Sequence, residues 1–313
     1  MLTRKSFILA AVLTAAAIIT GCKSMGIKIK NNREIKKGGI KKGLVLWYSQ
    51  AGNTERIGRA IASAWRKQGL KVTSGDYRSF DAAEINGYDI IAAGSPVFYY
   101  EVPENFRDWL KTIPSIEGVP VASFVTFGGA GGNQHNTACE LMALLADKGG
   151  VPAGIEKFSN MSTFAPTWSS GNTGRILKYR HLPDEGTFNR ARGYAESVLS
   201  SARAGKGIEV NGNFSFNNTM KGGVSIFFTK LLMTGHSIDH KKCIRCGICV
   251  EKCPVDAIGP DRDGVDTGKC IACFGCVNNC PVNAVKLRFA GKDVYGFTEF
   301  LKRNGITIRE PEA

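Results

Sequence analysis

Eight of the ten cysteines of this 313-residue chain lie between residues 243 and 280, in two copies of one spacing. Each copy reads C-x2-C-x2-C-x3-C-P; the first starts at Cys243 and the second at Cys270. Disulfide scaffolds are usually small secreted domains with irregular cysteine spacing, whereas short regular gaps favour metal ligation. The repeat therefore predicts a compact metal-binding domain near the C-terminus.

The spacing resembles that of bacterial two-cluster ferredoxins, in which three closely spaced thiolates hold one iron–sulfur cluster and the fourth cysteine crosses to the other cluster. The resemblance implies one [4Fe-4S] cluster on Cys243, Cys246, Cys249 and Cys280, and a second on Cys253, Cys270, Cys273 and Cys276. Two structural zinc ions are the alternative, but zinc sites need neither the third cysteine nor the following proline. We expect a small α+β ferredoxin domain over 237–290 and a C-terminal tail over 291–313.

The preceding region, 43–203, alternates short apolar runs with amphipathic segments, which predicts an α/β fold with a doubly wound parallel sheet. Strands are expected at 44–48, 71–77, 88–93, 120–127 and 154–158, and helices after the first strand and at 103–112, 135–148 and 185–203. In such sheets the ligand crevice lies beyond the carboxyl ends of the strands. Binding residues are therefore expected in the loops at those ends.

Three of these loops are built from small or turn-forming residues. The first suits a phosphate group, because hydroxyls and free backbone N–H groups meet there at a helix N-terminus. It lacks the lysine of a Walker loop and the GxGxxG of dinucleotide-binding proteins. The candidate cofactor-binding residues are Ser49, Gln50, Ala51, Gly52, Asn53 and Thr54 in the first loop, Pro96, Val97, Phe98 and Tyr99 in the second, and Gly128, Gly129 and Gly131 in the third.

The segment Tyr48–Thr54 resembles the phosphate loop of flavodoxins, and Gly94–Val97 resembles their second flavin loop. The resemblance implies a flavodoxin-like domain that holds FMN, with its phosphate on the first loop and its ring between the Pro96 and Gly128 loops. Ala51 stands where the family often carries Thr, so one hydroxyl is missing and we expect weaker FMN binding. A plain turn is the alternative for each loop taken alone.

The first 21 residues carry two cations followed by an apolar run of about thirteen residues, which is typical of a signal peptide and short for a membrane span. The run ends in Thr20-Gly21-Cys22, which resembles the lipobox of bacterial lipoproteins and implies lipidation of Cys22. An exported lipoprotein on the outer face of the cytoplasmic membrane is expected. The alternative is an uncleaved signal anchor with a cytoplasmic domain, which the basic residues after the run favour.

The formal net charge is +14, and the segment 22–42 contributes eight Lys or Arg and one Glu. A basic tether beside a lipid favours an anionic membrane surface, and a solvated linker is the alternative for this segment. Nucleic acid is a poor candidate partner, because no aromatic residues or binding motif accompany the charge.

Residues 204–236 are expected to be a linker that ends in an apolar packing segment, 224–233, between the two domains. A contact of this segment with a membrane or partner ranks second.

A chain that carries both a flavin and iron–sulfur clusters suits electron transfer between one-electron and two-electron partners. We expect an electron carrier with a redox partner protein at a membrane surface. A flavin-dependent reductase of a small acceptor such as a quinone is the alternative, and a zinc-stabilised membrane adaptor is a third possibility. No clear catalytic acid, base or nucleophile is present.

Overall fold

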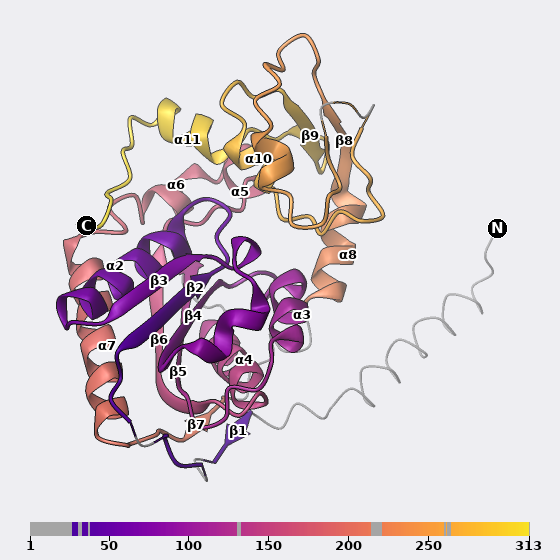
Figure 1. Ribbon diagram of the computed structural model, residues 1–313. Helices are drawn as coiled ribbons and strands as arrows, with labels where there is room; N and C mark the ends of the chain where they lie inside the picture. Colours follow the sequence, from indigo (N-terminus) through magenta and orange to yellow (C-terminus); the bar gives the residue numbers. More distant parts are fainter. Residues whose placement is uncertain are drawn as a thin grey trace.

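The computed structural model describes residues 27–30, 33–36, 38–129, 133–213, 221–259, 261 and 264–312 (Figure 1). The predicted signal segment, Cys22 and Gly131 lie outside these residues. Every helix within the described ranges is too short or too polar to span a bilayer.

Five parallel strands form the central sheet: β2 (Lys42–Trp47), β3 (Lys71–Asp76), β4 (Ile90–Pro96), β5 (Pro120–Gly128) and β6 (Val151–Asn160). Their order is β3-β2-β4-β5-β6, which is the flavodoxin-like order. Strands β2, β4 and β5 are nearly continuous apolar runs because both faces of the sheet are covered. The strand order reverses between β2 and β4, so the expected crevice lies at their carboxyl ends. The predicted doubly wound α/β fold is confirmed.

Two pairs of helices cover the sheet. On one face lie α2 (Asn53–Lys67) and α7 (Glu185–Arg203), and on the other α3 (Glu104–Thr112) and α4 (Gln134–Ala146). The α2 side chains Ile57, Ile61 and Trp65 are fully buried, as their helical spacing predicts. The short 3-10 helices η1 (Tyr77–Ser79) and η2 (Ala82–Gly87) connect β3 to β4.

The cysteine-rich part lies above the carboxyl edge of the sheet (Figure 1). It contains an antiparallel sheet of order β10-β9-β8, formed by β8 (Met233–Ile238), β9 (Val285–Phe289) and β10 (Lys292–Asp293). Its helices are α9 (Ile248–Glu251), α10 (Gly275–Asn279) and α11 (Phe297–Arg303). Because β8 begins before residue 237 and β10 follows residue 290, the folded unit extends beyond both expected bounds.

The two parts share one apolar core. Met161, Trp168 and Ile176, from the chain after β6 with α5 (Pro166–Ser169) and α6 (Thr173–Leu177), pack with Phe274 and Phe300 of the cysteine-rich part. The Trp168 indole N–H also donates to the Tyr295 carbonyl at 2.9 Å. A shared core holds the two parts in a defined arrangement.

The C-terminal segment, expected to be a tail, forms α11 and packs against the rest of the fold. Beyond α11 it returns to α2, where the Glu310 carboxylate contacts Arg56 and Arg59 at 2.8 and 2.9 Å. At the other end, β1 (Lys28–Ile29) pairs with β7 (Val210–Asn211) beside the α3/α4 face.

The expectation that residues 224–233 pack between the domains is wrong for most of their apolar side chains. Residues 223–232 form α8 (Gly223–Leu232), and the buried side chain of its inner face is Thr229, with Ser225 and Ile226 half-buried. The apolar residues left on the surface are Val224, Phe227, Phe228, Leu231 and Leu232. Ser225 and Thr229 face the cavity at the junction, together with part of Phe228, while the other large apolar side chains face outward.

Candidate cofactor sites

A cavity of about 510 Å³ lies at the carboxyl edge of the sheet. It is lined by nearly all of the described residues that the three predicted loops contribute: Ser49, Gln50, Ala51, Asn53, Thr54, Pro96, Val97, Phe98, Tyr99, Gly128 and Gly129. Gly52 is not in the lining, and Gly131 lies outside the described residues. Loops separated by up to 80 residues in the sequence thus meet around one space.

The first loop presents a helix N-terminus to the cavity. Gly52, with φ 85°, precedes α2, and no side chain caps the first turn of this helix. Thr54 is buried, and its hydroxyl lies 2.8 Å from that of Thr126 on β5. The backbone N–H groups and the helix dipole at this point favour a negatively charged group.

The second loop makes an unusually tight turn with two large residues. Tyr99 and Tyr100 have φ of 45° and 68°, and Phe98 and Glu101 bond each other's backbone across the turn at 2.9 and 3.1 Å. A left-handed backbone at residues other than glycine costs on the order of 1–3 kcal/mol, so surrounding contacts must hold it.

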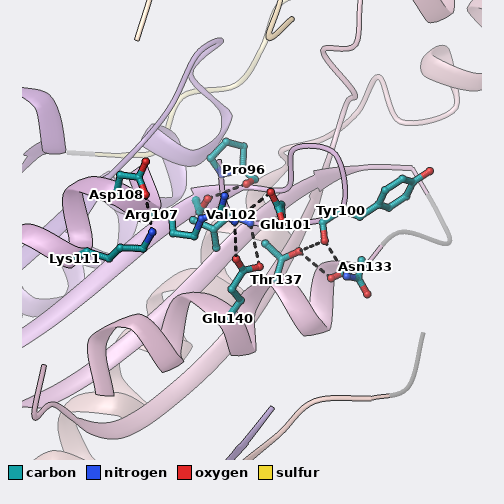
Figure 2. Close-up of polar contacts among 11 residues, drawn as sticks. Pro96, Tyr100, Glu101, Val102, Arg107, Asp108, Lys111, Asn133, Thr137 and Glu140 are labelled. Atoms are coloured by element: carbon teal, nitrogen blue, oxygen red, sulfur yellow. Dashed lines mark hydrogen bonds and ion pairs between the residues drawn. The ribbon is translucent and has the colours of Figure 1, made fainter. Parts of the chain in front are cut away.

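Figure 2 shows those contacts, which come from α3 and α4. The Tyr100 carbonyl accepts from the Asn133 amide at 2.8 Å and from the Thr137 hydroxyl at 3.2 Å. After the turn, Arg107 contacts Glu101 at 3.1 Å and Glu140 at 3.3 Å. Burial raises the pKa of Glu140. The network keeps the turn closed and the Tyr99 side chain at the cavity.

The third loop is constrained by a fourth that sequence reasoning missed. A Cβ at Gly128 would lie 2.3 Å from Ser162 Cα, so the close approach that this glycine permits is to protein backbone. The loop after β6, Met161–Phe164, lines the cavity, as does Arg175 of α6. The 161–164 loop follows the carboxyl end of the last strand, and this position was the sequence signal that could have marked it as a binding loop.

Two polar atoms at the first loop await a partner. Among the described residues, the buried Asn53 Oδ1 atom makes no hydrogen bond, and the buried Gln50 Nε2 atom, which lies near the Cys273 sulfur, has no nitrogen or oxygen partner. Buried polar groups are ordinarily paired, so a donor and an acceptor left open near a 510 Å³ cavity suit a polar ligand. These residues fit a bound FMN.

The eight cysteines gather in two groups, each around its own small cavity. The outer cysteine group comprises Cys243, Cys246, Cys249 and Cys280. The inner cysteine group comprises Cys253, Cys270, Cys273 and Cys276. In each group three cysteines come from one copy of the repeat and one from the other. Among the described residues, no three or more His, Cys, Asp or Glu side chains converge as a single metal ion requires.

The two copies of the repeat adopt the same backbone. The left-handed residues Arg245, Gly247 and Asp256 recur 27 positions later as Ala272, Phe274 and Asn283. Backbone N–H groups donate to cysteine sulfurs in matching pairs, from Arg245 to Cys243 and Ala272 to Cys270 at 3.4 Å, and from Ala257 to Cys253 at 3.2 Å and Ala284 to Cys280 at 3.1 Å. Such N–H groups suit a sulfur-rich anionic centre and tune its potential.

The inner cysteine group is the more enclosed. Cys276 is buried, and burial raises its pKa and brings that of Cys273 to about 12. His236 of β8 places its Nε2 atom 3.4 Å from Cys276 Sγ. The outer group, in contrast, includes the exposed Cys246.

The inner group also adjoins the 510 Å³ cavity at the carboxyl edge of the sheet, which we call the flavin-type cavity. Ala272, Cys273 and Phe274 line that cavity together with the first and second loops. The Tyr99 hydroxyl donates to the Ala272 carbonyl at 2.7 Å, and the Asn279 amide donates to the Gln50 carbonyl at 2.9 Å. Sequence reasoning treated the two sites separately and did not anticipate this shared wall.

Comparison with known proteins bears on each part. Residues 236–259, which contain the first cysteine repeat, match the model of the 4Fe-4S binding domain. No curated protein matches the chain.

Among solved structures, a short-chain flavodoxin associated with a non-canonical PDU bacterial microcompartment is 16% identical, with a TM-score of 0.41, and the match covers 52% of this chain and 99% of that one. Flavodoxin 1 from Bacillus cereus is 18% identical, with a TM-score of 0.39, over 51% of this chain and 98% of that one. Rubredoxin oxygen:oxidoreductase from Desulfovibrio gigas is 16% identical, with a TM-score of 0.40, over 52% of this chain and 36% of that one. The strand order of the sheet is that of a flavodoxin-like α/β fold, and the segment that matches the 4Fe-4S binding domain follows it in the chain.

Proposed function

We propose that this protein is an electron-transfer protein that holds FMN in the cavity and one [4Fe-4S] cluster on each cysteine group. The observation that carries the proposal is the shared wall: Ala272, Cys273 and Phe274 line the same cavity as the flavin-type loops. FMN exchanges one or two electrons and a [4Fe-4S] cluster exchanges one, so the pair suits conversion between two-electron and one-electron partners.

The chain's own residues divide the work of binding. The N-terminus of α2 with Thr54 and Asn53 would receive the FMN phosphate, and the Pro96–Tyr99 and Gly128 loops would flank the ring. Because Ala51 has no hydroxyl, the first loop would bind the phosphate through Thr54, backbone N–H groups and the helix dipole. The inner group lies next to this cavity and the outer group lies at the surface, which supports an outer entry point for a redox partner protein.

Anaerobic purification with iron, sulfide and flavin analysis tests the proposal. We expect about eight irons, about eight sulfides and about one FMN per chain. Zinc in place of iron would support the adaptor alternative, and a chain without flavin would contradict the shared-site proposal. The matched control is a Cys246→Ser variant, which should lose about half of the iron and keep the flavin.

A second candidate, a flavin-dependent reductase of a small acceptor such as a quinone, is favoured by one observation. The cavity extends beyond the flavin-type loops to Arg175 and to Phe228 and Thr229 of α8. Reduction of a soluble quinone by the reduced protein at many equivalents per chain would support this role, whereas a single stoichiometric oxidation would favour the carrier.

We further propose that lipid on Cys22 and the basic tether hold the protein at a membrane surface. The support is in the sequence, because the apolar run, the lipobox-like Thr20-Gly21-Cys22 and the cationic segment follow one another. Mass spectrometry of the mature N-terminus and the release of a Cys22→Ser variant into the soluble fraction test this placement. An unmodified full-length chain would favour the signal-anchored alternative.

A further inference from the structure

The outward face of α8 carries an apolar stripe. Its members sit at i, i+3, i+4, i+7 and i+8, which is the spacing of the buried face of an amphipathic helix. Here that face points to solvent, with exposed fractions of 44% for Val224, 63% for Phe227, 52% for Phe228, 67% for Leu231 and 44% for Leu232. A contiguous exposed stripe of this kind marks a contact surface.

The charge around the stripe suits an anionic surface. Between residues 221 and 233 the charged residues are Lys221 and Lys230, with no acidic side chain, and the Lys230 ammonium group donates to the Gly268 carbonyl at 3.4 Å. Two acidic residues approach the start of the helix, Glu101 near Gly222 and Glu140 near Lys221, and their carboxylates contact Arg107 at 3.1 and 3.3 Å. Cations beside Phe and Leu side chains are typical of helices that lie in a membrane interface.

The position of α8 relative to the N-terminus agrees with a membrane contact. The chain enters the described fold at Ile27, whose carbonyl accepts from Gly212 N–H at 2.7 Å, and this segment packs beside the α3/α4 face. The start of α8 belongs to the same side, because Gly222 N–H donates to the Tyr99 carbonyl before α3. In Figure 1, β1 and α8 both lie on the α3/α4 side of the sheet.

The stripe is too small to hold two copies of the chain together. Five side chains at these exposures present on the order of 500 Å². A stable protein–protein interface buries about 800 Å² on each partner. A lipid surface needs no complementary partner, and apolar area with nearby cations is sufficient for it.

We infer that α8 rests in the interface of an anionic bilayer, with Phe227 and Leu231 inserted, as a second membrane contact besides the N-terminus. The inference rests on the membrane placement proposed above. Since Phe228 belongs to the stripe and also lines the cavity, this contact turns the mouth of the cavity toward the lipid. A lipid-soluble acceptor would then reach the cavity from the bilayer.

The test uses the full chain on vesicles of phosphatidylglycerol and phosphatidylcholine with brominated acyl chains. A Phe227→Trp variant should show a blue-shifted emission that bromine quenches, relative to the unsubstituted protein with its own tryptophans. The matched control is Lys67→Trp at the exposed end of α2, on the opposite face of the sheet, whose emission should stay unquenched. Adding Leu231→Glu to F227W should abolish the quenching while the chain stays on the vesicles.

The outcomes are distinct. A bound chain with an unquenched F227W indole overturns this inference and leaves the N-terminal placement standing. A full chain that does not bind vesicles overturns both. A dimer in sedimentation velocity that Leu231→Glu disperses assigns the stripe to a second copy and also overturns the inference.

Discussion

The outer and inner cysteine groups share one motif and one backbone but differ in their surroundings. Around the outer group, Cys246, Ile244 and Val250 are exposed. Around the inner group, Ala272, Phe274 and Cys276 are buried, and the cavity lies directly behind Cys273. The repeated sequence therefore yields two equivalent cysteine groups, and the packing around each group decides which one is exposed and which one adjoins the cavity. Exposure and hydrogen bonding set the reduction potential of iron–sulfur clusters in general.

Removing one ligand from each group should give the largest difference. Cys276→Ser and Cys246→Ser should each lose about four of eight irons. Cys276→Ser should also lower the melting temperature further, because Cys276 belongs to the apolar core that both parts share. Iron analysis, thermal unfolding and stopped-flow flavin reduction under anaerobic conditions check this. Flavin reduction that survives in Cys276→Ser and is lost in Cys246→Ser would reverse the assignment of inner and outer.

Glycines near the two groups offer a second contrast. A Cβ at Gly275 would lie 2.6 Å from Gln50 Nε2 and 3.2 Å from the Lys252 carbonyl, so Gly275→Ala should displace the buried Gln50 side chain. Overpacking of this kind costs about 1–3 kcal/mol. Gly247→Ala changes a left-handed residue with open space around it and should cost about 1 kcal/mol. FMN affinity by equilibrium dialysis should fall in Gly275→Ala alone; equal loss in both would show that the contact with Gln50 has no influence on the flavin site.

The contact of His236 with Cys276 should affect the reduction potential of the proposed inner cluster alone. His236 Nδ1 is buried and has no hydrogen-bond partner among the described residues, so a proton on Nδ1 would be an unpaired donor. The proton therefore belongs on Nε2, which can donate it to Cys276 Sγ. Loss of this bond in His236→Leu should lower the potential of the inner cluster by up to about 60 mV, which corresponds to about 1.4 kcal/mol. His236→Gln, which retains an N–H donor, is the control. Redox titration followed by electron paramagnetic resonance should find the outer cluster unchanged, and a shift of both clusters would argue for a general structural effect.

The smallest effect is expected at the hydrogen bond between the second loop and the inner group. Tyr99→Phe removes the hydrogen bond to the Ala272 carbonyl and should destabilise the protein by about 0.5–1.5 kcal/mol. Tyr100→Phe is the matched control, because Tyr100 shares the left-handed backbone and its ring points away from the polar network in Figure 2. Denaturant unfolding should separate the two variants, and identical midpoints would mean that the Tyr99 bond adds nothing to the junction.

Much of this arrangement could be predicted from the sequence. The apolar runs at 44–48 and 120–127 and the amphipathic helix at 185–203 gave the sheet and its layers, because burial on both faces and helical periodicity leave direct marks in a sequence. The three loops followed from the rule that ligands bind beyond the carboxyl ends of parallel strands.

The rest depends on contacts that local patterns do not encode. The periodicity of Val224–Leu232 indicates an amphipathic helix but not whether its apolar face meets protein or solvent, so the expected packing segment was assigned to the wrong surroundings. The contact of Gln50 with Gly275 joins residues 225 positions apart, and no spacing rule connects them. The site at the junction is therefore visible only in the folded chain.

The shared wall has a consequence for how the protein is made. The first three loops are complete once residue 133 has been synthesised, yet Phe228 and Ala272–Phe274, which finish the cavity, follow about a hundred residues or more later. The residues that complete the flavin-type cavity are therefore synthesised together with the second cysteine repeat. In the proposed function, the flavin would therefore be enclosed only after the cysteine-rich part has folded over the first three loops.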